Sequence, residues 1–186
     1  MSDYRLSRWT YNTGASGSGS IGMLSASGGM IVLDDPAGTP QRFDFVSYGI
    51  GVGKRIAQKF RLPDISPKML NGREIAGIGS PTDFDAAGEV YMTPSFHGQE
   101  LSVSDLCGAT NTIDVTGGFL IARGKMWLYA GIQPALMLAG IVNPAFMGLA
   151  LNTAKARIEM RGISEGLIDG IAATSSIGVL EHKGRY

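Results

Sequence analysis

The sequence predicts an α+β protein, with an antiparallel β-rich N-terminal two thirds followed by C-terminal apolar helices. Short runs with a period of two, separated by turn residues, recur over residues 1–125 and are typical of antiparallel strands. The texture then changes, because residues 126–154 contain no Asp, Glu, Lys or Arg. At 186 residues the chain has the length of one domain. We expect a single domain, 1–186, with a β-rich part, 1–125, and an apolar helical part, 126–186.

The clearest strand pair lies in the first quarter of the chain. Residues 30–33, Met-Ile-Val-Leu, form a compact β-type run, and residues 34–40 are dense in turn formers. Residues 41–48 then alternate, with Phe43 on one face and Val46 on the other. These three segments predict a β-hairpin.

The other elements of the first part are less regular. The Gly/Ser run at residues 14–20 has the composition of a flexible loop. A short basic helix is expected at residues 54–60. Residues 112–115 and 119–122 are strand-like, and the Thr-Gly-Gly between them predicts a turn.

Charge and cysteine content exclude some classes of protein. Sixteen basic residues balance sixteen acidic ones, which argues against a general nucleic-acid binder. The balance is uneven along the chain: residues 54–73 are basic and residues 74–114 acidic, so these blocks either steer a partner or form solvated loops. Cys107 is the only cysteine and the N-terminus is polar. We expect synthesis in the cytoplasm without a signal peptide, and any secretion by a route that reads none.

The uncharged stretch at residues 126–154 is long enough to cross a bilayer as a helix. Pro134 and Pro144 interrupt it, so two shorter helices or a hairpin are expected rather than one straight helix. The stretch fits either a membrane segment or the buried helix pair of a soluble domain.

A glycine row follows this stretch. Four small residues recur at a spacing of four and would form a bare ridge on a helix; they are Gly162, Gly166, Gly170 and Thr174. Such a ridge lets a neighbouring helix approach closely within lipid, so a helix-packing role is expected for these four residues. Each glycine weakens a helix by about 1 kcal/mol, so the row needs such a packing reason.

Two carboxylates lie beside the glycine row. Glu165 and Asp169 are one helical turn apart on a neighbouring row. In an inserted assembly they would turn to a hydrated lumen, because a carboxylate against lipid is costly. We therefore expect them to line a pore, unless they solvate the outer face of a soluble helix.

A short chain without a signal, a long uncharged stretch and a Gly-xxx-Gly-xxx-Gly helix together resemble the glycine-zipper pore-forming effectors of bacterial type VI secretion. The resemblance is carried by Gly162, Gly166 and Gly170 and covers mainly residues 126–178. It implies an antibacterial toxin that inserts C-terminal helices and forms an ion-permeable pore in a target cell membrane. It also implies target membrane lipid, self-association, an immunity protein and a secretion-machine carrier as partners. The alternative is a soluble structural or binding component of a multi-subunit assembly.

Enzyme motifs are incomplete. Gly162-Ile-Ser-Glu-Gly166 matches a nucleophile elbow in sequence, but that turn must follow a strand, and residues 156–161 favour a helix. The Gly-rich run at residues 49–54 lacks the Ser or Thr that follows the lysine of a phosphate-binding loop.

One polar cluster would be the place to look for catalysis. It consists of His97, Glu100, Asp105 and Cys107. In an enzyme, Cys107 would be the nucleophile and His97 the base. The spacing fits no standard zinc site, and a surface loop is the favoured reading. We therefore predict no catalytic residue, cofactor or metal.

Overall fold

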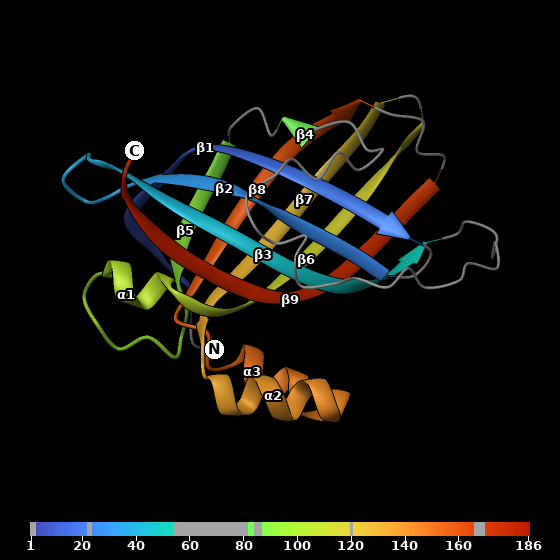
Figure 1. The fold of residues 1–186 in the computed structure, drawn as a ribbon. Helices are drawn as coiled ribbons and strands as arrows, with labels where there is room; N and C mark the ends of the chain where they lie inside the picture. The colour runs from blue at the N-terminus through green and yellow to red at the C-terminus, as the bar shows by residue number, and fades with distance from the viewer. Residues whose placement is uncertain (1–2, 22–23, 54–81, 84–86, 120, 166–169) are drawn as a thin grey trace.

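The computed structural model describes residues 3–21, 24–53, 82–83, 87–119, 121–165 and 170–186, and its main body is a closed antiparallel barrel of eight strands (Figure 1). Neighbours around the barrel follow the order β1, β2, β3, β9, β6, β7, β8, β5, and β5 pairs again with β1. A ninth, two-residue strand, β4, pairs with β1. The strands are β1 (Arg5–Ile21), β2 (Leu24–Asp34), β3 (Pro40–Gly53), β4 (Thr82–Asp83), β5 (Ala87–Met92), β6 (Gly108–Phe119), β7 (Ile121–Ile132), β8 (Ala156–Glu165) and β9 (Gly170–Arg185).

The hairpin expected at residues 30–48 is confirmed. β2 and β3 pair in continuous register, with Asp34 opposite Pro40. The turn between them closes on Asp35, whose carboxylate accepts hydrogen bonds from the backbone N–H groups of Ala37 and Thr39. Gly38 has a φ of 80°, a backbone conformation that glycine adopts without a steric penalty.

Beyond residue 154 the described residues form strands instead of the predicted C-terminal apolar helices, and this corrects the fold class to mainly β. β8 lies between β7 and β5, and β9 lies between β3 and β6, so both belong to the barrel wall. Their residues follow a period of two: Ile158 and Met160 are buried in the barrel, while Arg161 is exposed. Pairing on both sides outweighs the helix-favouring residues of this segment.

Two further expectations are corrected by the same pairing. The Gly/Ser run at residues 14–20 is strand, paired in register with β2. The Thr-Gly-Gly at residues 116–118 lies within β6, and the turn falls later, where Phe119 pairs with Ile121. The basic block at residues 54–73 and the expected helix at residues 54–60 lie outside the described residues.

The helices are short and lie outside the barrel wall. The two helices expected around Pro134 and Pro144 are confirmed, although residues 126–132 belong to β7. Proline occupies the first turn of α2 and of η2, where it removes no helical hydrogen bond. The helical elements are α1 (Val103–Leu106), α2 (Pro134–Val142), the 3-10 helix η2 (Pro144–Phe146) and α3 (Met147–Leu151). Within the part of the chain that the structure describes, no helix has the length and apolar character needed to cross a membrane.

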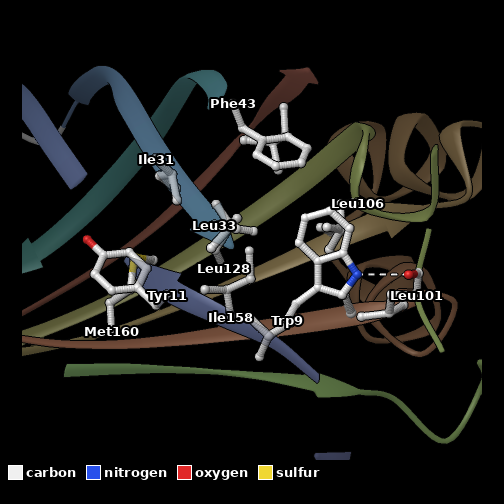
Figure 2. Close-up of a cluster of buried hydrophobic side chains, with 14 of the residues drawn as sticks. Trp9, Tyr11, Ile31, Leu33, Phe43, Leu101, Leu106, Leu128, Ile158 and Met160 are labelled. Atoms are coloured by element: carbon white, nitrogen blue, oxygen red, sulfur yellow. Dashed lines mark hydrogen bonds between the residues drawn. The ribbon is translucent and has the colours of Figure 1, made fainter. Parts of the chain in front are cut away.

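Large apolar side chains fill the interior of the barrel beside α1, and we call this cluster the plug (Figure 2). The segment that carries α1 contributes Leu101 and Leu106. The Trp9 indole N–H donates a hydrogen bond to the Leu101 carbonyl at 2.8 Å, which ties that segment to β1. The buried members are Trp9, Tyr11, Ile31, Leu33, Phe43, Phe45, Val90, Met92, Leu101, Leu106, Leu128, Ala130, Ala156, Ile158, Met160 and Leu180.

Candidate functional site

The glycine row does not form a helix ridge. Gly162 lies in β8 opposite Gly124, and Gly170 lies in β9 opposite Gly118. Thr174 is also in β9, twelve residues beyond Gly162 and on a different strand. Gly166 lies outside the described residues. Gly162, Gly170 and Thr174 thus lie in strands in this structure, and a packing role for the glycine row in the membrane stays a prediction.

The two predicted pore-lining carboxylates are only partly described. Glu165 is the last residue of β8 and pairs with Ile121 of β7. Asp169 lies outside the described residues. A role for either carboxylate in an ion path stays a prediction.

The polar cluster at residues 97–107 holds the α1 segment in place. Glu100 accepts hydrogen bonds from the Ser7 hydroxyl and the Arg8 backbone N–H. Burial raises the pKa of Glu100, but these bonds and the Leu101 N–H outweigh it, so the pKa lies below its usual value. Asp105 forms a capping box with Ser102. It also forms an ion pair with Lys155, in which Asp105 Oδ1 lies 2.7 Å from Lys155 Nζ.

The cluster therefore has a structural explanation. The pKa of Asp105 is likewise lowered, because hydrogen bonds from Lys155 and Ser102 outweigh the effect of its burial. Cys107 is half-buried against the plug, and His97 is exposed. Among the described residues, no group of three or more His, Cys, Asp or Glu is arranged to hold a metal ion.

The other enzyme motifs also lie in strands. Ser164 is inside β8 and pairs with Ala122, whereas a nucleophile elbow needs a sharp turn into a helix. Residues 49–53 belong to β3 and pair with β9. The Gly-rich run is thus part of the barrel wall rather than a phosphate-binding loop.

The elements α2, η2 and α3 lie together outside the barrel, and we call them the helix pair (Figure 1). The outward side of the helix pair carries an exposed apolar surface. Its inward side packs on Tyr129 and Ile177, on the outside of the barrel. Its outward side is open: Val142 is 87% exposed and Leu138 64%. The exposed large side chains are Leu138, Ile141, Val142, Phe146 and Leu149. No charge interrupts this surface, because residues 126–154 contain none.

A second apolar surface lies on the outer faces of β3, β9 and β6, which we call the apolar wall. Val46 of β3 is 42% exposed and pairs with Val179 of β9, which is 48% exposed. Tyr48 is 43% exposed and pairs with Ile177, the residue on which the helix pair packs. The two apolar surfaces therefore adjoin, and Val115 of β6 is exposed on the same side of its sheet.

Charged residues mark where the apolar wall begins. Asp44 and Glu181 are paired in register, immediately before the Val46 and Val179 pair. Each forms an ion pair on its own strand, Asp44 with Arg42 at 2.8 Å and Glu181 with Lys183 at 2.6 Å. A charged rim thus borders an apolar surface, an arrangement that marks an interaction site for a protein or a membrane.

The inner faces of the same strands carry buried polar residues beside members of the plug. Four inward residues are buried: Ser47, Thr110, Thr112 and Ser176. They share strand faces with members of the plug, since Ser47 follows Phe45 by two residues and Ser176 precedes Leu180 by four. At these positions polar residues lie inside and apolar residues outside, which reverses the usual arrangement of a barrel in water. The sequence prediction missed this wall, and the alternation of residues 175–180 is the signal that could have found it.

A different network occupies the outer face of β7 and β8. Glu159 is buried and accepts hydrogen bonds from Arg161 at 3.0 Å and Trp127 Nε1 at 3.2 Å. It also forms an ion pair with Lys125. Burial raises the pKa of Glu159, but these partners outweigh it, so the pKa lies below its usual value. The outer surface of the barrel therefore has an apolar side and a charged side.

The chain is similar over nearly its whole length to a protein of Pseudomonas aeruginosa. That protein is named Toxin protein Tse4. The two are 27% identical over 186 aligned residues, which cover 94% of this chain and 93% of that protein. No protein-family model matches the chain, and no solved structure matches it significantly. The similarity to Tse4 therefore spans the barrel strands and the helix pair alike.

Proposed function

We propose that this protein is a secreted antibacterial toxin that acts at the membrane of a target cell and makes that membrane permeable to ions. The whole-length similarity to a protein named as a toxin supports the toxin activity. The resemblance of residues 126–178 to type VI secretion effectors supports secretion by the same kind of machine. On this proposal the partners are target membrane lipid, further copies of the chain, a carrier of the secretion machine and an immunity protein in the producing cell.

The observation that carries the membrane proposal is the helix pair. Val142, Leu138 and Ile141 present large apolar side chains to solvent, and each is more than half exposed. Burying apolar area contributes about 25 cal/mol per Å², so several such side chains entering lipid together favour binding by several kcal/mol. No charge within the helix pair opposes this transfer.

The route of insertion differs from the one the sequence predicted. The later part of the segment expected to insert as helices contributes β8 and β9 to the barrel wall, whereas its earlier part forms the helix pair. The surfaces that remain for lipid are the helix pair and the adjoining apolar wall. We therefore assign membrane contact to these two surfaces.

Vesicle leakage tests the proposal directly. Purified protein added to vesicles of bacterial lipid, loaded with potassium and a potassium-sensitive dye, is expected to release potassium. The Val142→Asp plus Leu138→Asp variant is expected to bind vesicles at least about tenfold more weakly, because it places two charges in the contact. Gln133→Glu is the matched control, since it adds one exposed charge at the start of α2.

The same experiment separates the alternative function. A soluble binding component of a larger assembly would use the exposed apolar surface for a protein partner and would leave vesicles intact. Intact vesicles at all lipid compositions, together with no loss of membrane potential when the chain is produced in bacteria, would overturn the membrane proposal.

A further inference from the structure

We propose that ions cross the membrane through the interior of the barrel, while lipid contacts the apolar wall; this inference rests on the proposed function and names its conducting path. The path is assigned to the strands β3, β9 and β6, which carry buried polar residues on the inside and exposed apolar residues on the outside.

Side-chain size decides whether the interior of an eight-stranded barrel is filled. A barrel of this strand number is just wide enough for ordinary side chains to pack across it. Trp9 and Phe43 fill it at the α1 end. Farther along β3, the position that continues the face of Phe43 and Phe45 is occupied by Ser47, which is buried. A serine side chain spans less of the interior than an aromatic ring does.

β9 continues the same pattern across its pairing with β3. Gly178 pairs with Ser47, and Ser176 follows on the same face of the strand. A Cβ atom at Gly178 would collide with the Val46 carbonyl oxygen and the Ser47 backbone. Only glycine fits at this position, because the two strands approach closely here. The inner face of β9 therefore carries no side chain at residue 178.

Two buried hydroxyls at the plug have no hydrogen-bond partner among the described residues. Thr112 is 5% exposed, and it pairs with Leu128 of the plug on one side and Ser176 on the other. Its hydroxyl has no hydrogen-bond partner among the described residues. The buried Tyr11 hydroxyl is likewise without one among them, and Figure 2 shows it at the end of the plug opposite Leu101. Such groups are costly in a dry interior and are satisfied by water or a hydrated cation.

The length of the apolar wall fits the path. A strand needs about 9 to 11 residues to cross the hydrocarbon of a bilayer at a tilt. β9 starts at Gly170, and the charged rim at Glu181 marks its other limit. The part between them has the required reach, with Val179 outside and Ser176 inside.

The plug closes the path in this structure. It fills the interior at the α1 end, where the Trp9–Leu101 hydrogen bond holds the α1 segment. For current to flow, the plug must separate in the membrane. The structure is thus the closed form of the proposed channel.

Cysteine modification in planar bilayers tests the path. In a Cys107→Ser background, Ser176→Cys places a thiol on the inner face and Val179→Cys places one on the outer face of the same strand. A cationic methanethiosulfonate reagent forms a mixed disulfide with an accessible thiol and releases methanesulfinate. Conductance through Ser176→Cys is expected to fall at least about twofold on modification, because the lumen gains bulk and positive charge. Conductance through Val179→Cys is expected to stay unchanged when the same reagent is added, because this thiol faces lipid rather than the lumen.

A second variant covers the case in which Ser176→Cys does not fold. Thr112→Lys adds a fixed positive charge to the inner face, and its reversal potential under a KCl gradient is expected to move toward that of chloride. If neither variant alters the current, or if modification of Val179→Cys blocks it, conduction does not run through the barrel interior. The proposed function would still stand in either case. Wild-type protein that carries no current would overturn both.

Discussion

Single glycines decide where the chain can leave the barrel. Gly131 has a φ of 67° near the end of β7, just before the helix pair begins. A Cβ atom there would collide with the Asp105 carbonyl oxygen of α1 and lie 3.2 Å from Lys155 Cβ. Gly131 therefore lets α1 pack against the start of β8, in addition to adopting a backbone conformation that other residues avoid.

The Gly131→Ala variant is expected to lose about 3 kcal/mol of unfolding free energy, from backbone strain and from displacement of α1. Gly38→Ala is the matched control, because Gly38 also has a positive φ but its Cβ would meet no atom within 4 Å. That variant is expected to lose about 1 kcal/mol, from strain alone. Urea denaturation of the three proteins measures both values, and equal losses would contradict the packing role of Gly131.

Glu159 predicts a loss of stability in acid. Its folded pKa lies below the usual value because Lys125, Arg161 and Trp127 outweigh the effect of burial. A lowered folded pKa gives stability that is present above the unfolded pKa of about 4.5 and is lost as pH falls through the folded pKa. Glu100 and Asp105 shift in the same direction.

The urea midpoint is therefore expected to fall steadily between about pH 6 and pH 3. Glu159→Gln is expected to cost about 2 kcal/mol at neutral pH and to flatten this decline, because it removes one of the carboxylates that must be protonated. A variant with an unchanged slope would show that Glu159 does not contribute to the pH dependence.

At the scale of secondary-structure elements, the sequence predicted the strands and helices whose pattern lies within one short segment. The β2–β3 hairpin was predictable because alternation and turn residues lie within one segment. The helix pair was predictable because Pro134 and Pro144 mark two helix starts in an uncharged stretch. β8 and β9 were not, because a spacing of four residues is one helical turn and also two strand repeats. The glycine row therefore fits both structures, and only pairing with distant strands decides between them.

The apolar wall was missed for the same reason. Its residues come from β3, β9 and β6, which are separated along the chain and become neighbours only when the barrel closes. The outward Val46 and the inward Ser47 were visible as an alternation, but which face is buried depends on the whole barrel.

The helix pair is separable from the barrel. Ala130 pairs with Ala156, and the Lys155 backbone N–H donates to the Ala130 carbonyl at 2.9 Å, so the ends of the excursion already lie together. Replacing residues 133–153 by an Asn-Gly turn is expected to leave β-type circular dichroism and to abolish vesicle binding. Normal vesicle binding by the shortened protein would move the membrane contact to the barrel wall alone.

For the whole molecule, we expect the plug to couple the free energy of unfolding to the rate of potassium release. Trp9→Ala is expected to lower the unfolding free energy by about 3 to 5 kcal/mol and to raise the rate of potassium release per bound protein. Trp127→Ala is the matched control, because Trp127 lies on the outer face of β7 with Glu159 rather than in the plug. Where Trp9→Ala does not fold, Trp9→Phe removes the hydrogen bond to Leu101 and keeps most of the volume. Equal rates of potassium release from the Trp9 and Trp127 variants would show that the plug does not control opening of the path.

The hydrogen bond from Trp9 to the Leu101 carbonyl also bears on why the proposed toxin would not damage the cell that makes it. The side chains that would have to part before current flows are the same ones that hold the native state together. Opening in water would therefore forfeit much of the folding free energy, whereas opening against lipid is offset by the transfer of the exposed apolar side chains. On the proposed function, one sequence therefore accounts for both dormancy in the producing cell and activity in the target cell, because contact with the bilayer offsets the cost of opening the hydrophobic core.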